Sequence, residues 1–157
     1  RASAAGEGVR FAPVALQGTL APLITGLARL AQRRHITLRQ TVDSGVRVHM
    51  DGQDLQEMVG NLLDNALRWG KSDVHIRLQA QSEMLLLVVS DDGPGMTPQE
   101  CQAAVQRGKR LDEQRSGSGL GLAIVTDLVT LYHGQMRLQR AESGGLEVVI
   151  ELPVVAT

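Results

Sequence analysis

The sequence is poor in aromatic residues and in cysteine. Its 157 residues include one phenylalanine, one tryptophan and one tyrosine, namely Phe11, Trp69 and Tyr132. A surface that binds nucleic acid by stacking bases on aromatic rings is therefore not expected. The single cysteine, Cys101, excludes an internal disulfide and a cysteine-based zinc site, and it is typical of a protein from a reducing compartment.

Neither sign of charge is in large excess, and long hydrophobic runs are absent. The 16 basic and 17 acidic residues give a formal net charge of −1, which is not typical of proteins that bind nucleic acid or membrane surfaces through charge. The longest apolar run, Met84 to Val89, is much too short to span a membrane. The composition, 43% hydrophobic and 21% charged, is that of one folded domain. We expect Arg1 to lie within a longer protein.

Hydrophobic periodicity predicts one α+β domain over residues 9–157, preceded by a linker at residues 1–8. Apolar residues recur every three or four positions in predicted helices at 16–31, 53–69 and 120–132, with a shorter helix at 98–106. Pro22 predicts a kink or a helix start within the first of these. Alternating residues predict strands at 36–41, 46–50, 74–80, 84–89, 135–140 and 146–152.

The Asp43-Ser44-Gly45 turn favours pairing of the first two predicted strands as a hairpin. The partial segregation of strands from helices predicts a two-layer sandwich, with one sheet that carries the three main helices on one face.

The second predicted helix carries polar residues on one face. Asn61, Asn65 and Arg68 are four and three positions apart, so their side chains lie on the same side of the helix. An asparagine oxygen can ligate Mg²⁺, which prefers hard oxygen ligands and keeps several waters. A solvent-exposed polar face is the other interpretation of this spacing.

A second polar segment, Asp91-Asp92-Gly93-Pro94-Gly95, directly follows the predicted buried strand. A carboxylate at the end of a strand can accept a hydrogen bond from an exocyclic amine such as that of adenine. The glycines would let the backbone approach a flat ring closely. A simple Gly-Pro turn explains the same residues without any ligand.

The third segment, Gly117-Ser118-Gly119-Leu120-Gly121-Leu122, opens a predicted helix. Free amide groups at a helix start can bind a phosphate, although the spacing is neither that of a P-loop nor that of a Rossmann fingerprint. A glycine hinge is the alternative. Four cations precede this segment and would either close over a triphosphate or form a solvated charged loop: Arg107, Lys109, Arg110 and Arg115.

In this order the three segments resemble the N, G1 and G2 boxes of the catalytic, ATP-binding domain of bacterial sensor histidine kinases. This superfamily also contains DNA gyrase B, the Hsp90 chaperones and MutL. The resemblance covers about Phe11 to Pro153. It implies the Bergerat ATP-binding fold, with a mixed and mostly antiparallel sheet, and an ATP lid at about 96–116. The cationic part of the lid is similar to that of PhoQ-type sensor kinases.

The resemblance also implies roles for individual residues. Asn65, with Asn61 close by, would ligate Mg²⁺, and Asp91 would accept from the adenine amino group. Gly93 and Gly95 would give the base room. The arginines that would face the phosphates are Arg68, Arg110 and Arg115. The turn at the phosphate-binding helix start would comprise Gly117, Ser118, Gly119, Leu120 and Gly121.

The activity that the resemblance implies is transfer of the γ-phosphoryl group of Mg-ATP to a histidine. Hydrolysing members of the superfamily carry a glutamate base where this chain has Asn61, and an amide cannot take a proton from water. The four histidines lack the acidic neighbour of an acceptor site, so we expect the acceptor to lie outside this sequence: His35, His49, His75 and His133.

The implied partners are a dimerisation and phosphoacceptor domain of the same protein and, for the full-length protein, a response regulator. We expect the fragment to be monomeric, cytoplasmic and unable to phosphorylate itself, and its parent to be a homodimer in the bacterial inner membrane. We expect no nucleic-acid partner. The alternatives are a serine kinase of the anti-sigma-factor type, an ATP hydrolase, or a degenerate module that only binds a partner.

Overall fold

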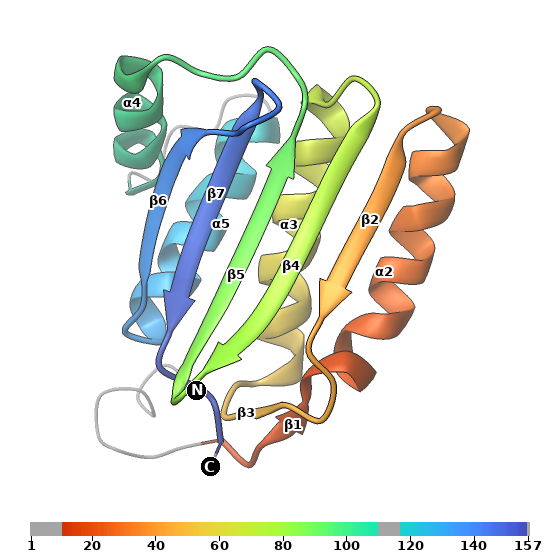
Figure 1. The fold of residues 1–157 in the computed structure, drawn as a ribbon. Helices are drawn as coiled ribbons and strands as arrows, with labels where there is room; N and C mark the ends of the chain where they lie inside the picture. Colours follow the sequence, from red (N-terminus) through yellow and green to blue (C-terminus); the bar gives the residue numbers. More distant parts are fainter. Residues whose placement is uncertain (1–10, 110–116, 157) are drawn as a thin grey trace.

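The computed structural model describes residues 11–109 and 117–156, although not the side chains of residues 107–109 and 117–120. Its helices and strands follow one another in the order shown in Figure 1: β1 (Val14–Ala15), α2 (Leu16–Arg33), β2 (Thr37–Val42), β3 (Arg47–Val48), α3 (Gly52–Trp69), β4 (Asp73–Gln81), β5 (Met84–Asp91), α4 (Pro98–Lys109), α5 (Gly117–Leu131), β6 (Gln135–Arg140) and β7 (Leu146–Leu152).

A five-stranded sheet in the order β2-β4-β5-β7-β6 forms one layer of the molecule. Only β2 and β4 are parallel, and the other neighbours are antiparallel. Helices α2, α3 and α5 cover one face of the sheet, and α4 lies beside the β6 edge (Figure 1). The predicted α+β sandwich with a mixed, mostly antiparallel sheet and three main helices on one face is therefore confirmed.

The core lies between the sheet and the helices because alternate residues of the central strands are apolar. Nine apolar side chains on the helix-facing side of β4, β5 and β7 are at most 4% exposed: Val74, Ile76, Leu78, Leu85, Leu87, Val89, Val148, Ile150 and Leu152. From the facing helices, α3 contributes Leu55, Met58, Val59 and Leu62. This packing fixes the orientation of α3, which bears both asparagines of the predicted magnesium site.

The predicted hairpin of residues 36–41 and 46–50 is wrong. Strand β2 pairs in parallel with β4, with Thr37 opposite Asp73, while β3 pairs with β1 in a separate two-stranded sheet. The carboxylate of Asp43 accepts a hydrogen bond from the Ala80 amide at 3.0 Å, so the end of β2 is tied to β4 as well. Alternating polarity identifies a strand but not its partner, and the Asp-Ser-Gly turn therefore suggested the wrong neighbour.

Helix α2 begins at Leu16 and continues through Pro22, so the predicted start near Pro22 is wrong. It buries Leu16, Leu20, Ile24 and Ala31. Proline removes one amide donor, but a helix held by its apolar face tolerates that loss.

A buried hydrogen-bond network joins the first turn of α3 to the end of α5. The hydroxyl of Tyr132 donates to the carboxylate of Asp54 at 2.6 Å and accepts from the Asp51 amide at 3.1 Å. Asp51 in turn caps α3, because its carboxylate accepts from the amides of Gln53 and Asp54. Burial, together with the hydrogen bond to Asp54, raises the pKa of Tyr132, so its hydroxyl stays a donor.

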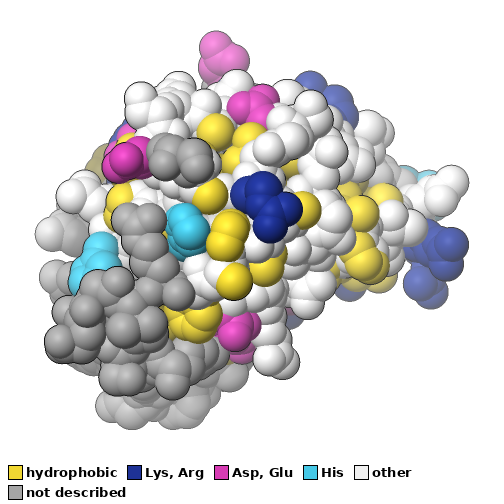
Figure 2. All heavy atoms as spheres, turned by 90° about the horizontal axis from the view of Figure 1, so that it is seen from below, with side chains coloured by type: hydrophobic (Ala, Val, Ile, Leu, Met, Phe, Trp, Pro, Cys, Tyr) yellow, Lys and Arg dark blue, Asp and Glu magenta, His cyan; other side chains and the backbone are white. Residues whose placement is uncertain are grey.

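Figure 2 shows the molecule from the end that carries β1 and β3. Charged side chains of both signs are scattered over this face, with small groups of hydrophobic side chains between them. The distribution agrees with the near-zero net charge. Within residues 11–109 and 117–156, no helix combines the length and the apolar character that crossing a membrane requires.

We expect Tyr132→Phe to lower the free energy of unfolding by about 1–3 kcal/mol, because the buried Asp54 carboxylate loses a donor. Urea unfolding followed by circular dichroism measures this loss. An unchanged midpoint and slope would contradict a stabilising role for the hydroxyl.

Candidate functional site

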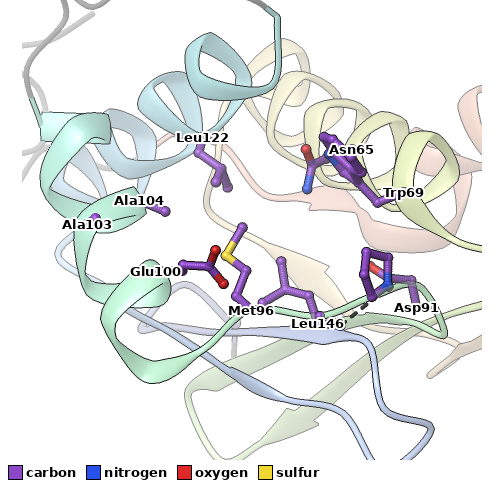
Figure 3. A pocket seen from close by; sticks show the side chains of 11 residues that line it. Asn65, Trp69, Asp91, Met96, Glu100, Ala103, Ala104, Leu122 and Leu146 are labelled. Atoms are coloured by element: carbon purple, nitrogen blue, oxygen red, sulfur yellow. Dashed lines mark hydrogen bonds between the residues drawn. The ribbon is translucent and has the colours of Figure 1, made fainter.

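A cavity of about 380 Å³ opens between α3, α4 and α5 and the ends of β5 and β7 (Figure 3). It is lined by Asn65, Trp69, Asp91, Pro94, Gly95, Met96, Glu100, Ala103, Ala104, Leu122 and Leu146. Most of these side chains are apolar, and only a few polar groups point inward. Such a lining suits a flat organic ring with a polar edge.

Asp91 lies at the base of the cavity, at the last position of β5, and is 4% exposed. Its Oδ1 accepts from the amide of Gly93 at 2.8 Å and from that of Leu146 at 3.3 Å. No donor among the described residues is hydrogen-bonded to Oδ2. Burial raises the pKa of Asp91 above its ordinary value, and the two amides offset only part of that effect. The carboxylate thus retains a free acceptor in a nearly dry site.

The neighbouring Asp92 has a different role, which sequence reasoning did not assign. Its carboxylate accepts from the amides of Lys71, Ser72 and Asp73 and from the Ser72 hydroxyl. Burial alone would raise the pKa of Asp92, but these hydrogen bonds hold it well below its ordinary value. Asp92 therefore fastens the loop after β5 to the start of β4.

The two asparagines lie one turn apart on α3, and one of them lines the cavity. Asn65 is 9% exposed, and its amide points into the cavity with no hydrogen-bond partner among the described residues. Asn61 does not line the cavity. Its Nδ2 donates to the Glu57 carbonyl at 2.7 Å, and its Oδ1 lies 3.3 Å from where a Cβ on Gly121 of α5 would be.

These residues fit a magnesium ion that is bound together with phosphates. The amide of Asn65 faces the open cavity without a protein partner among the described residues, so it is available to a polar ligand. No group of three or more His, Cys, Asp or Glu residues in the described part of the chain could hold a metal. Mg²⁺ does not need one, because it keeps waters and takes substrate oxygens as ligands.

The cavity also contains residues that the sequence did not single out. The ring of Trp69, at the end of α3, is 49% exposed at the rim, and Met96 and Glu100 face it from the other side (Figure 3). Glu100 forms a capping box with Thr97, in which each side chain accepts from the other's amide. The Thr-x-x-Glu spacing could have located the start of α4; the apolar lining residues resemble ordinary core residues and carry no such signal.

The predicted glycines have distinct surroundings. A Cβ on Gly93 would lie 2.1 Å from the Trp69 carbonyl oxygen, so this glycine lets the loop pack against the end of α3. Gly95 lines the cavity and has a φ of +75°, which favours glycine. Helix α5 begins at Gly117, as the third motif predicts.

Of the three predicted phosphate-facing arginines, Arg68 is the one within the described residues, and it does not line the cavity. Arg68 pairs with Asp64 at 3.3 Å on the exposed side of α3 and is not a lining residue. Arg110 and Arg115 lie outside the described residues, as do the side chains of Ser118 and Leu120. Of the predicted lid, the described part contains α4, which is slightly longer than the predicted helix at 98–106.

Comparison with protein families matches residues 50–156 to the family described as histidine kinase-, DNA gyrase B-, and HSP90-like ATPase. The sensor protein kinase CarS of Pseudomonas aeruginosa is 42% identical over 133 residues, which cover 85% of this chain and 30% of CarS. The virulence sensor histidine kinase PhoQ of Salmonella typhimurium is 32% identical over 155 residues, or 95% of this chain and 31% of PhoQ. The chain thus spans about 30% of the length of these curated relatives.

Solved structures of histidine kinases are also similar to this chain. The mycobacterial sensor histidine kinase MprB superposes with a TM-score of 0.75 at 32% identity, over 92% of this chain and 97% of that one. Full-length ShkA in complex with AMPPNP gives a TM-score of 0.78 at 25% identity, over 93% of this chain and 31% of that one. The catalytic domain of histidine kinase ThkA, with a TM-score of 0.79 and 17% identity over 91% of this chain and 95% of that one, supports the fold alone.

We expect Asp91→Asn to increase the free energy of unfolding at pH 7 without nucleotide, because the amide avoids burying a charge. The raised pKa means that the carboxylate destabilises the fold above that pKa and ceases to do so below its ordinary value of 3.8. The difference between variant and wild type should therefore vanish as the pH falls. Thermal unfolding from pH 3 to pH 8 measures it.

Asp92→Asn serves as the control with the opposite sign. Its lowered pKa means that the carboxylate stabilises the fold above 3.8 and that this contribution is lost on acidification. At pH 7 we expect a loss of about 1–3 kcal/mol. Equal shifts of the same sign in the two variants would contradict the assigned roles.

Proposed function

The chain belongs to the histidine kinase-, DNA gyrase B- and HSP90-like ATPase family, and from this premise we propose that it is the ATP-binding catalytic domain of a sensor histidine kinase. It binds Mg-ATP in the cavity and transfers the γ-phosphoryl group to a histidine of a dimerisation domain outside this sequence. The observation that carries the proposal is the buried Asp91 carboxylate, whose Oδ2 remains a free acceptor at the base of an otherwise mostly apolar cavity.

The base of ATP lies on Asp91. Oδ2 accepts a hydrogen bond from the 6-amino group of adenine, while guanine would present a carbonyl oxygen there and place two acceptors face to face. The apolar side chains of Met96 and Leu146 and the ring of Trp69 contact the faces and edges of the base. Gly93 and Gly95 keep the loop after β5 close to this site. The AMPPNP complex of the similar ShkA supports a nucleotide as the occupant.

The phosphates lie between α3 and the start of α5. Asn65, with Asn61 nearby, holds the Mg²⁺, which when bound neutralises negative charge on the phosphate oxygens. The first amides of α5, which begins at Gly117, have no partners within the helix and suit an anion. The lid, residues 96–116, covers the nucleotide, and two of its cations, Arg110 and Arg115, face the phosphates.

Asn61 favours a kinase over a hydrolase. Its side chain is a neutral amide whose nitrogen donates to the Glu57 carbonyl, so it cannot take a proton from an attacking water. A neutral imidazole nitrogen needs no such base, because it attacks the γ-phosphorus with its own lone pair. The bond to the β,γ-bridging oxygen then breaks, and ADP leaves with that electron pair. The protein contributes the position of the two reactants and the neutralisation of charge.

The other partners follow from this assignment. The phosphorylated histidine passes its phosphoryl group to the receiver domain of a response regulator. The fragment is a monomer in the cytoplasm, and its parent is a homodimer in the bacterial inner membrane. The chain's span of about 30% of CarS leaves room for the dimerisation domain and a sensor in the remainder of the parent.

We expect the chain to bind AMPPNP saturably in calorimetric titrations, more tightly with Mg²⁺ and with strong preference over the guanine analogue. Asp91→Asn should weaken binding by about hundredfold or more, because it puts a donor opposite a donor. Asp127→Asn removes a charge on the exposed face of α5 and should change nothing. Binding that does not distinguish the two bases, or that survives Asp91→Asn, would remove the base site.

We expect no label on the chain alone when it is incubated with ATP that is radioactive at the γ-position. A longer protein that includes the dimerisation domain should acquire acid-labile phosphohistidine. Stable phosphohistidine on the chain alone would contradict the assignment of the acceptor. Acid-stable phosphoserine on a partner would instead indicate a serine kinase, and release of free phosphate without transfer a hydrolase.

A further inference from the structure

The turn that joins β6 to β7 packs directly on Asp91. It belongs to none of the three motifs, and in the sequence it is only a hairpin turn. The Ser143 hydroxyl donates to the Asp91 carbonyl at 2.9 Å, and the Leu146 amide donates to Asp91 Oδ1 at 3.3 Å. The same turn thus binds both the main chain and the side chain of the residue at the base of the cavity.

Gly145 makes the closest approach. A Cβ at this position would lie 2.2 Å from the carbonyl oxygen of Asp91 and 2.4 Å from its Oδ1. Real Cβ atoms do not come this close to backbone, so any side chain at position 145 would force Asp91 and the turn apart. Gly145 has no positive φ, so its requirement for glycine is steric and arises from Asp91 itself.

These contacts fix the direction in which the unoccupied oxygen of the carboxylate points. Oδ1 is occupied by the amides of Gly93 and Leu146. A half-turn of the carboxylate would only exchange its two equivalent oxygens, whereas a smaller rotation would break both hydrogen bonds in a site that is 4% exposed. Only Oδ2 is left for a ligand. If the turn moved away, Oδ1 would lose the hydrogen bond from the Leu146 amide. The carboxylate could then rotate, and Oδ2 would no longer point in one fixed direction.

We propose that Gly145 and Ser143 are positioning residues for base selectivity, which act by holding the Asp91 carboxylate in the one orientation that presents Oδ2 to the 6-amino group of adenine. The inference rests on the proposed adenine site. A glycine that served only the turn would affect folding and every nucleotide alike. A positioning residue affects only a ligand that has the 6-amino group, and this difference can be measured.

The test compares ATP with purine riboside triphosphate, which has hydrogen in place of the 6-amino group, by titration of the 157-residue chain. The wild type should prefer ATP by about tenfold to hundredfold, as for a hydrogen bond to a charged acceptor. Gly145→Ala should lose most of this preference through weaker ATP binding, while its affinity for the analogue changes by less than about threefold. Ser143→Ala should lower the preference by about twofold to fivefold.

Gly144→Ala is the matched control in the same turn. Gly144 has a φ of +99°, so alanine strains the backbone, but no atom lies within 4 Å of the added Cβ. We expect a lower unfolding temperature and an unchanged preference for ATP. This control distinguishes the effect of backbone strain in the turn from the effect of displacing Asp91.

The proposal would be overturned if Gly145→Ala weakened the binding of ATP and of the analogue equally. It would also be overturned if Gly145→Ala and Ser143→Ala both preferred ATP over the analogue as strongly as the wild type does. If Gly145→Ala does not fold, the ratio measured for Ser143→Ala decides alone. A wild type that binds both nucleotides equally would instead show that the proposed adenine site is wrong, so the two failures are distinguishable.

Discussion

The site depends on the burial of one carboxylate that has no ion-pair partner among the described residues. Asp91 ends the central strand of the sheet, where water is scarce, and backbone amides supply the stabilisation that a cation would otherwise give. One amide comes from its own loop, and the other comes from β7. The register of β5 against β7, with Ser90 opposite Glu147, brings the Leu146 amide to Asp91. The sheet pairing therefore sets the chemistry of the cavity.

Two consecutive carboxylates thereby acquire opposite properties. Asp91 points to the helix side of the sheet and is only partly stabilised as an anion, whereas Asp92 points away and binds the amides of Lys71 and its neighbours. Their pKa values are displaced in opposite directions for this reason. The first carboxylate is available to a ligand at some cost to the fold, and the second stabilises the loop that holds the first.

Much of the architecture could be predicted from the sequence. The periodic segments predicted α3, β4, β5 and β7. The order of the three motifs indicated a single site, and Asn65, Asp91 and Gly95 from the first two motifs line one cavity. The pairing of β2 could not be predicted, because it depends on a strand more than thirty residues away. Apolar lining residues such as Leu122 and Leu146 have the same pattern as core residues. Arg68 shares a helix face with Asn65, but its long side chain reaches Asp64 instead.

The parallel pairing of β2 with β4 bears on the order in which the domain can fold. Parallel neighbours cannot be joined by a tight turn, and the crossover here contains the whole of α3. Closing so long a loop has an entropic cost that the hairpin of β4 and β5 avoids, so β2 joins the sheet late. Because α5 and β7, which come last in the chain, also line the cavity through Leu122 and Leu146, a chain still emerging from the ribosome has no complete cavity.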